Sequence, residues 1–362
     1  MRLAFKELLH NKKKYSLITV IVILMMFMVL FLSGLVDGLG RAVSAGIEKM
    51  PVTAFAISDD AEGLITISAL EDEQYEEIQK QTDGRAATID IMRMYLMKTD
   101  SEEKLDVVYF SIDPEGALAP EVIEGNTFAE SDAEYPLLLD DDFKAEGIEV
   151  GDTVLDSSTG MEFTVAGFVE DAMYGHVSVA YIPSDDYTEL MTAVNPEYKQ
   201  YYHATALLEG DEDIEVDGVI IFTKDEVINE LPGYMSEQMT IKMVDWMLVV
   251  ITAVILAVFF LVINLQKEKE FGVMKAIGVS MGRLTRFILA EVVLIALCGA
   301  VIAAILVIAM AAGLPGTMPF YLQARNVIVI LGAFVLISMA GSLLSIIRVS
   351  KIDPAAIIGG DN

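Results

Sequence analysis

The sequence is poor in the side chains that build catalytic and metal sites. Its 362 residues include one cysteine, Cys298, and three histidines, His10, His176 and His203. A single cysteine excludes a disulfide scaffold and a cysteine-rich metal site, and three scattered histidines give little material for a zinc cluster or a catalytic triad. The patterns G-x-x-x-x-G-K-[ST], G-x-S-x-G and H-E-x-x-H do not occur. We therefore expect no catalytic residue, no intrinsic cofactor and no protein-bound metal.

Basic residues are also scarce. The chain has 24 Lys and Arg against 54 Asp and Glu, a formal charge of −30. Nucleic-acid binding needs clustered positive charge, so a nucleic-acid partner is excluded. Hydrophobic residues nevertheless make up 54% of the chain, and the mean hydropathy is +0.50. The acidic and the apolar residues must therefore belong to different segments.

Four apolar windows are each long enough to cross a lipid bilayer, which takes about 20 helical residues. They cover residues 16–36, 246–265, 288–312 and 327–347. Lysines precede the first window, as in a signal peptide, but its apolar run is too long and no A-x-A-like cleavage site follows. We predict four transmembrane helices, the first of which is retained.

The distribution of Lys and Arg predicts the orientation, because cytoplasmic segments are enriched in them. Residues 1–15, 266–287 and 348–362 together hold twelve basic and five acidic residues, whereas residues 37–245 hold 48 acidic and 11 basic ones. We predict a multi-pass membrane protein with both termini in the cytoplasm. Residues 37–245 and the short loop 313–326 are then extracellular.

The segment 37–245 is long enough for an independent core, and we predict a mixed α/β domain. Alternating or β-branched runs predict strands over residues 107–112, 153–155, 162–169, 177–182 and 218–222. Helical spacing with acidic faces predicts helices over residues 68–81 and 185–194. Residues 37–50 and 235–245 also have a helical pattern, so the first two spans should continue outward as stalks. The acidic runs 140–142 and 211–213 lack the spacing of a calcium-binding loop and are predicted as solvated loops.

The cytoplasmic segment 266–287 contains an amphipathic stretch, EKEFGVMKAIG, at residues 268–278. Phe271, Met274 and Ile277, spaced i, i+3 and i+6, are predicted to form one face that docks in a groove on a partner. The residues alone leave open a helix that lies on the bilayer surface. Glu291, within the third span, is expected to snorkel or to pair with Arg283 or Arg286.

Four spans, a large domain between the first two, and an E-x-G-[VI]-x-[KR]-A-[IL]-G segment before the third resemble the MacB/FtsX superfamily of ABC transporter permeases. The resemblance implies a homodimer in the lipid bilayer and a separate cytoplasmic ABC ATPase, in two copies, that binds ATP-Mg. It also implies that this segment contacts the ATPase. The residues concerned are Glu270, Phe271, Gly272, Met274, Lys275, Ile277 and Gly278.

Five further segments resemble the haem-exporting permeases of Gram-positive bacteria, the HrtB type. They are residues 2–8, 33–41, 171–176, 317–322 and 353–360. This resemblance implies a permease of a bacterial plasma membrane that exports haem from the membrane with ATP hydrolysed by the separate subunit. Two alternatives remain: export of another amphiphile, such as an antimicrobial peptide or a lipid, and an FtsX-like mechanotransmitter that regulates a cell-wall hydrolase.

Haem needs an axial ligand for its iron, an apolar slot for its ring and cations for its propionates. Candidates lie near the outer ends of the first two spans and in the loop 171–176. The candidate ligands and ring contacts are Glu48, Met50, Tyr174, His176 and Tyr234, and the candidate propionate partners are Arg41, Lys49 and Lys242. The alternative for both tyrosines is an anchor at the membrane interface, and for His176 it is an ordinary surface histidine.

Overall fold

The computed structural model describes residues 12–314 and 318–350. The chain divides into two compact units: Met1–Gly38 with Met239–Asn362, here called the helical unit, and Leu39–Gln238, here called the inserted domain. Each is described by itself. The sequence segments 2–8 and 353–360, as well as residue 317, lie outside the described residues.

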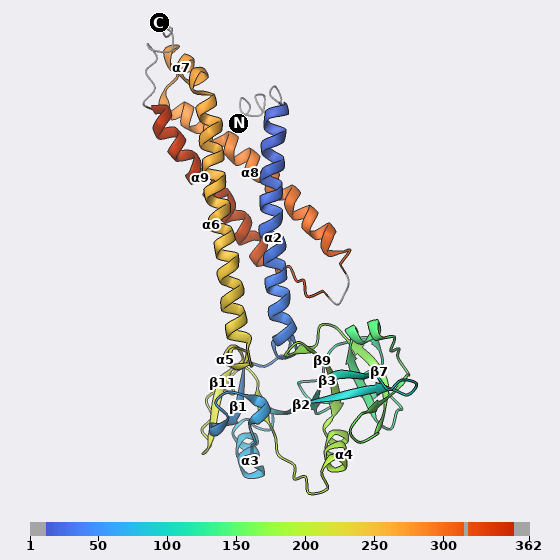
Figure 1. Cartoon of the computed structure of the whole chain (residues 1–362). Coiled ribbons are helices and arrows are strands. Elements are labelled where there is room, and N and C mark those ends of the chain that lie inside the picture. Colours follow the sequence, from blue (N-terminus) through green and yellow to red (C-terminus); the bar gives the residue numbers. More distant parts are fainter. Residues whose placement is uncertain (1–11, 315–317, 351–362) are drawn as a thin grey trace. The chain divides into compact units, whose positions relative to one another are not determined.

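Four long helices make up most of the helical unit: α2 (Lys12–Glu48), α6 (Tyr234–Gln266), α8 (Met281–Ala311) and α9 (Ala324–Ser350) (Figure 1). All four are long and apolar enough to cross a membrane, which confirms the four predicted spans. A short helix, α7 (Glu268–Ala276), lies between α6 and α8. The ends of α2 and α6 extend beyond the apolar windows, as the stalk prediction requires.

The core of the helical unit combines large apolar side chains with small residues where helices approach closely. Met26 of α2 and Phe260 of α6 are both buried in it. A Cβ atom added to Gly299 of α8 would lie 2.5 Å from Cγ1 of Val22 on α2. Small residues let helix backbones approach in this way inside a bilayer, where packing replaces the hydrophobic effect.

The inserted domain contains eleven strands and three α-helices among its described residues. The strands are β1 (Ala54–Ser58), β2 (Ala87–Lys98), β3 (Lys104–Ile112), β4 (Val122–Gly125), β5 (Pro136–Asp140), β6 (Thr153–Asp156), β7 (Glu162–Val169), β8 (Met173–Tyr174), β9 (Val177–Pro183), β10 (Ala204–Leu207) and β11 (Val219–Thr223). The helices are α3 (Asp72–Gln81), α4 (Ser184–Val194) and α5 (Lys224–Glu230), and the 3₁₀ segments are η1 (Asp59–Ala61), η2 (Ile65–Ile67), η3 (Phe128–Glu130) and η4 (Asp141–Glu146). The mixed α/β prediction is confirmed.

Part of the sheet closes on itself. Strand pairing follows the order β2-β3-β9-β5-β7, and β6 pairs with both β7 and β2, which completes a ring. The β3–β9 and β5–β7 pairs are parallel, and the other pairs in the ring are antiparallel. From β2 the sheet continues outward through β10, β1 and β11. Closure removes exposed strand edges, which otherwise invite unwanted pairing.

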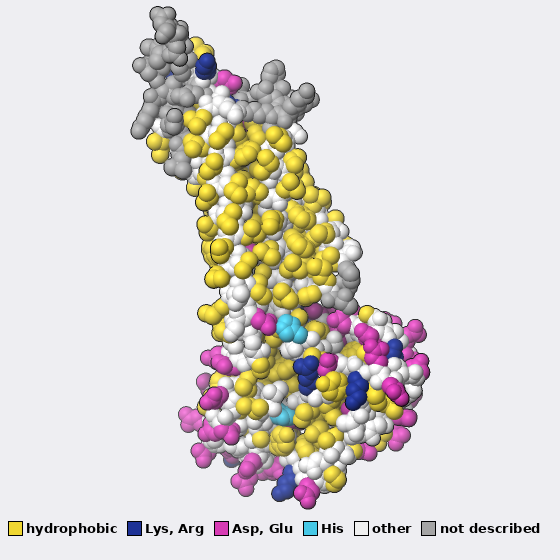
Figure 2. Space-filling model, in the orientation of Figure 1, with side chains coloured by type: hydrophobic (Ala, Val, Ile, Leu, Met, Phe, Trp, Pro, Cys, Tyr) yellow, Lys and Arg dark blue, Asp and Glu magenta, His cyan; other side chains and the backbone are white. Residues whose placement is uncertain are grey.

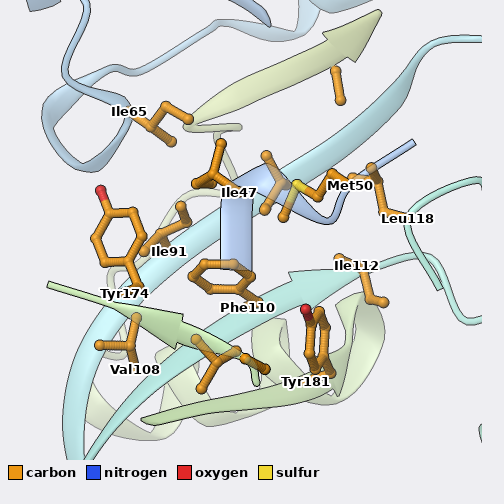
Figure 3. Close-up of a cluster of buried hydrophobic side chains, with 14 of the residues drawn as sticks. Ile47, Met50, Ile65, Ile91, Val108, Phe110, Ile112, Leu118, Tyr174 and Tyr181 are labelled. Atoms are coloured by element: carbon orange, nitrogen blue, oxygen red, sulfur yellow. The ribbon is translucent and has the colours of Figure 1, made fainter. Parts of the chain in front are cut away.

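Alternating side chains on the strands serve two separate cores, because successive residues of a strand point to opposite faces. On β3, Val107 and Tyr109 belong to the cluster inside the ring, while Val108 and Phe110 belong to the cluster outside it. The outer cluster also takes in Ile47 near the end of α2 (Figure 3). Packing against the ring therefore fixes the last turns of α2 on the inserted domain.

On the face that Figure 2 shows, acidic side chains lie along the margins of the inserted domain, whereas hydrophobic ones cover most of the described part of the helical unit. The prediction that both acidic runs are solvated is wrong for two of their members. Asp140 is 1% exposed, and its carboxylate accepts hydrogen bonds from the backbone N–H groups of Asp142 (3.1 Å) and Ala172 (2.5 Å). Burial raises the pKa of Asp140 to about 7. Asp211 is also buried, and it forms an ion pair with Arg85.

Candidate functional site

The last two turns of α2 carry a cluster of oxygen atoms. Ser44 is buried, and its Oγ donates a hydrogen bond to Oε1 of the exposed Glu48 at 2.8 Å. The phenol of Tyr234, the first residue of α6, also hydrogen-bonds the Ser44 side chain and lies within electrostatic range of Glu48. Two of the candidate haem contacts, Glu48 and Tyr234, are therefore brought together by a buried hydroxyl group.

A glycine allows α2 and the start of α6 to approach at this point. A Cβ atom added to Gly40 would lie 2.6 Å from Nε2 of Gln238, which is itself buried. That separation is well inside van der Waals contact, so a larger residue would force the two segments apart. The contact places Tyr234, one turn before Gln238 on α6, next to Ser44, one turn after Gly40 on α2.

Two candidate cations, Arg41 of α2 and Lys49 just after its end, are engaged by one carboxylate. Arg41 forms an ion pair with Asp171, and Nζ of Lys49 lies 3.7 Å from Oδ2 of Asp171. Lys49 also donates a hydrogen bond to the backbone carbonyl of Glu170. An incoming propionate would have to compete with Asp171 for either cation. The role of Asp171 leaves no local signal in the sequence, because its partner Arg41 is 130 residues away along the chain.

The loop that follows is held on α2 through its backbone. The N–H groups of Gly175 and His176 donate hydrogen bonds to the carbonyls of Val43 (3.0 Å) and Ala42 (2.9 Å). Both loop residues are left-handed, with φ of 58° and 64°, a conformation that costs a non-glycine residue about 1–2 kcal/mol. Nε2 of His176 lies 3.2 Å from Oε2 of Glu237, and both side chains are half-exposed. His176 is thus on the surface, and its role as a ligand stays a prediction.

Met50 and Tyr174 lie in the outer core of the inserted domain (Figure 3). Tyr174 is 8% exposed, and its ring meets Phe110 edge-on with centroids 5.6 Å apart. Burial raises the pKa of the Tyr174 phenol, so this group is protonated at neutral pH. Tyr174 is therefore a core residue rather than an interfacial anchor. An iron ligated by the Tyr174 oxygen would have to compete with the hydrogen bond between this oxygen and Thr66.

Met50 also borders a cavity of about 460 Å³ at the end of α2. Lys49, Glu170, Leu118 and Tyr181 contribute to its walls. Met50 is 4% exposed, so only an edge of its side chain reaches this space. The walls of the cavity therefore include both apolar and charged side chains.

Lys242 belongs to the helical unit, where it is exposed on α6. It is close enough to Asp37 of α2 for their charges to interact. Asp37 in turn accepts a hydrogen bond from Nδ2 of Asn326 at 2.8 Å. Lys242 as a propionate partner stays a prediction.

The prediction that Phe271, Met274 and Ile277 form one face is wrong, whereas the contact of this segment with an ATPase stays a prediction. Phe271 is fully buried against Leu284 and Ile288 of α8, and Met274 packs on the same cluster, whereas Ile277 is 75% exposed. The physical reason is helical geometry: at 3.6 residues per turn, position i+6 is rotated by about 120° from position i. Phe271 therefore fixes α7 on α8.

Three exposed side chains spaced by four residues lie along this segment: Lys269 and Val273 of α7, and Ile277, the residue that caps its C-terminus. They are called here the exposed face of α7. Among the other predicted ATPase contacts, Glu270 is exposed and Gly272 is buried. Gly278 has a φ of 90° and donates its N–H to the carbonyl of Lys275 at 3.0 Å. This left-handed glycine ends the turn after α7, as glycines at helix C-termini commonly do.

Glu291 neither snorkels nor pairs with Arg283 or Arg286. Its two carboxylate oxygens each accept a hydrogen bond from Nζ of Lys267 at 2.8 Å, and the two side chains are 5% and 3% exposed. The Lys267 ammonium also lies 5.2 Å from the centroid of the Tyr15 ring. Lys267 was not predicted as the partner of Glu291, because in the sequence it is one of several basic residues in a segment typical of the cytoplasmic side.

The fold defines a class of protein. Four membrane-spanning helices with a mixed α/β domain between the first and the second make this a multi-pass membrane protein. Within residues 12–314 and 318–350, no group of three or more His, Cys, Asp or Glu side chains is placed to hold a metal ion. The residues brought together in the inserted domain are instead a carboxylate, a phenol and ion-paired cations.

Comparison with protein families identifies the particular family. Residues 16–222 match the MacB-like periplasmic core domain, and residues 243–354 match the FtsX-like permease C-terminal domain. The chain belongs to the MacB/FtsX family of ABC transporter permeases. Membership in this family implies a cytoplasmic ATPase as partner.

Similar proteins cover the whole length of the chain. A protein of Staphylococcus haemolyticus (strain JCSC1435) named "Putative hemin transport system permease protein HrtB" is 27% identical over 367 residues, 99% of each chain. A protein of the same name from Staphylococcus epidermidis (strain ATCC 12228 / FDA PCI 1200) has the same identity and coverage.

Two solved structures resemble smaller parts of the chain. One is the extracellular domain of the noncanonic ABC-type transporter YknZ from Gram-positive bacteria, with 17% identity and a TM-score of 0.31, covering 44% of this chain and 83% of that one. The other is a domain of a permease protein from Porphyromonas gingivalis, with 14% identity and a TM-score of 0.29, covering 45% and 76%.

Proposed function

We propose that this chain is the permease subunit of an ABC-type exporter of haem in a bacterial plasma membrane. Two copies form the membrane part, two ATPase subunits bind ATP-Mg in the cytoplasm, and both termini of the permease are cytoplasmic. The inserted domain is then extracellular. Full-length similarity to proteins named as hemin transport permeases supports this cargo.

The observation that carries the proposal is the meeting of Glu48 and Tyr234 at Ser44. Carboxylate and phenol oxygens are hard donors, which suit ferric iron, and tyrosine is a known axial ligand of haem. Arg41 on α2 and Lys49, the first residue after α2, lie within a few residues of Ser44 along the chain and can attract propionates. A lipid or peptide cargo would need neither an iron ligand nor two cations in this arrangement.

The oxygen cluster at Ser44 and the exposed face of α7 suggest how haem is exported. Haem enters from the membrane, its iron takes an oxygen ligand from Glu48 or Tyr234, and its propionates replace Asp171 on Arg41 and Lys49. The ATPase docks on the exposed face of α7 and, on binding ATP, moves the first two spans. Separation or rotation of α2 against α6 breaks the contact at Ser44, so the ligand set that held the iron comes apart and haem is released outward.

Haem titration of the purified full chain tests the proposal. Glu48→Ala and Tyr234→Phe should each weaken or shift the haem absorbance band and sensitise cells to haem, while ATP hydrolysis by the complex stays near the parent level. Matched controls lie on α3, where Glu76→Ala and Tyr75→Phe remove the same groups from another part of the domain. The controls should bind haem as the parent does.

Two further variants examine the propionates. Asp171→Asn removes the competitor for Arg41 and Lys49 and should strengthen haem binding several-fold, by an amount of the order of an exposed ion pair. Lys242→Ala should weaken binding without changing the spectral type of the iron. If Glu48→Ala, Tyr234→Phe and Lys242→Ala all bind haem as the parent does, the cargo is another amphiphile or the pocket lies elsewhere.

A further inference from the structure

A cavity of about 390 Å³ lies within the helical unit, bordered by α2, α6 and α9. It is separate from the oxygen cluster at Ser44, since none of its lining residues belongs to the inserted domain. Apolar side chains make up almost all of its walls. They include Val29 of α2, Val249 and Leu256 of α6, and Ile330 and Phe334 of α9.

One end of this cavity carries a charge and an indole. Asp245 and Trp246 both line it, at the point where the apolar stretch of α6 begins. Oδ1 of Asp245 is buried and has no hydrogen-bond partner within the part of the chain that the structure describes. The neighbouring carboxylate, Asp37, differs because it accepts a hydrogen bond from Asn326 and lies near Lys242. Asp245 is thus a half-buried carboxylate, one oxygen of which is buried without a hydrogen-bond partner among the described residues, a costly arrangement.

A carboxylate beside an indole is the chemistry that recognises an alkylammonium group. The negative charge attracts the cation, and the face of tryptophan attracts it further through its quadrupole. The lining residues of α6 run from Asp245 to Leu256, which corresponds to about 16 Å along the helix axis. The cavity therefore offers an elongated apolar slot for a tail, with a site for a positively charged head at one end.

We propose that this cavity binds a lipophilic cation, an alkylammonium amphiphile with one hydrocarbon tail. The head lies between Asp245 and Trp246, and the tail lies along α6 against Phe334. An anionic amphiphile is disfavoured, because its head would meet the carboxylate of Asp245. The site does not depend on haem transport, and haem itself, with two propionates, is a poor ligand for it.

The single tryptophan of the chain makes a direct measurement possible, because Trp246 is the only source of tryptophan fluorescence. The full chain in nanodiscs of phosphatidylcholine is titrated with dodecyltrimethylammonium and, separately, with dodecyl sulfate, each expressed as a mole fraction of the bilayer. The proposal expects a saturable change in fluorescence with the cation and none with the sulfate.

Three variants keep the fluorophore and separate head from tail. Asp245→Asn should weaken binding of the cation about tenfold, the effect of losing roughly 1.4 kcal/mol. Glu230→Gln, the matched control, removes a carboxylate from α5 in the inserted domain and should bind as the parent does. Ala333→Leu adds bulk to a cavity wall on α9 and should weaken binding without any change of charge.

The outcomes decide between occupants. Equal affinity of the parent for the cation and the sulfate would mean that the cavity takes the tail of any amphiphile, as bulk lipid would, and the proposal would be wrong. Unchanged affinity in Asp245→Asn would overturn it as well. Asp245→Asn counts as misfolded if it does not elute as a single monodisperse peak in size-exclusion chromatography. In that case Ala333→Leu and the comparison of the two detergents still test the proposal: unchanged cation binding in Ala333→Leu would show that the cation does not bind in this cavity.

Discussion

Removing one partner of the Lys267–Glu291 ion pair is expected to destabilise the helical unit strongly. The ammonium lies 2.8 Å from both carboxylate oxygens, and the two side chains are only 3% and 5% exposed. Water therefore cannot replace a lost partner. Leaving one charge of a buried pair alone costs about 3–5 kcal/mol, whereas replacing both by apolar residues is often neutral or stabilising.

These magnitudes set an order of stabilities. Lys267→Met and Glu291→Leu should each lower the thermal midpoint by at least about 6 °C, taking roughly 2 °C per kcal/mol for a chain of this size. The double variant should recover most of this loss. The assay is the thermal unfolding of the detergent-solubilised protein, followed by tryptophan fluorescence. Double-mutant analysis then gives the coupling energy of the pair.

Arginine variants provide the control. Arg283→Met and Arg286→Met remove the cations that the sequence suggested as partners of Glu291, and they should change the midpoint little. The reasoning is refuted if either of them is as destabilising as Lys267→Met. It is also refuted if the double variant is as unstable as the sum of the two single variants, because the two charges would then not interact.

Three further outcomes are expected. The folded-state pKa of Asp140, about 7, lies above its unfolded value of 3.8, so the folded protein binds this proton more tightly. Protonation of Asp140 therefore adds at most about 4 kcal/mol to the free energy of unfolding; this contribution should be complete below pH 4 and disappear as the pH rises towards 7. Asp140→Asn should flatten this part of the stability profile, as measured by calorimetry. Ile277→Asp on the exposed face of α7 should prevent co-purification of the ATPase without loss of folded permease, whereas Phe271→Ala should lower stability by about 3–5 kcal/mol; normal co-purification with Ile277→Asp would contradict the docking face. With the native cysteine replaced by alanine, a cysteine at Ser158 should react with an impermeant thiol reagent in intact cells and one at Ser280 should not; labelling at Ser280 would reverse the proposed orientation.

The elements that sequence predicted well are those with a strong local pattern. The four spans are long apolar runs, and β7 and β9 have β-branched runs whose predicted bounds nearly coincide with the observed ones. Strand β2, in contrast, was not predicted, because Asp90 and Arg93 interrupt its apolar pattern. The strand pairs on both sides and changes partners along its length, so no single alternation runs through it. Closure of the ring depends on the pairing of β6 with the distant strand β2, and two other pairs in the ring join distant strands in parallel. Pairing between distant strands leaves no local signal in the sequence.

Some residues of the candidate site could likewise be predicted from the sequence, and others could not. Residue type and position along α2 and α6 were enough to select Glu48 and Tyr234, since both are iron-binding residue types near the ends of spans. The hydroxyl of Ser44 that joins them was not predicted, because serine at a helical position is usually unremarkable in sequence. The error at α7 was of another kind: spacing of six residues was treated as one face, although seven or four would be needed.

The contact between Gly40 and Gln238 has a consequence for the origin and engineering of such permeases. It brings the first and last residues of a domain of about 200 residues, Leu39–Gln238, to within reach of a short peptide link. A domain whose ends meet can be inserted into a loop between two helices without straining either one. The same junction should accept grafts: a foreign domain with adjacent termini could replace residues 39–238, or a tight turn could close the gap, while the four membrane helices keep their own packing.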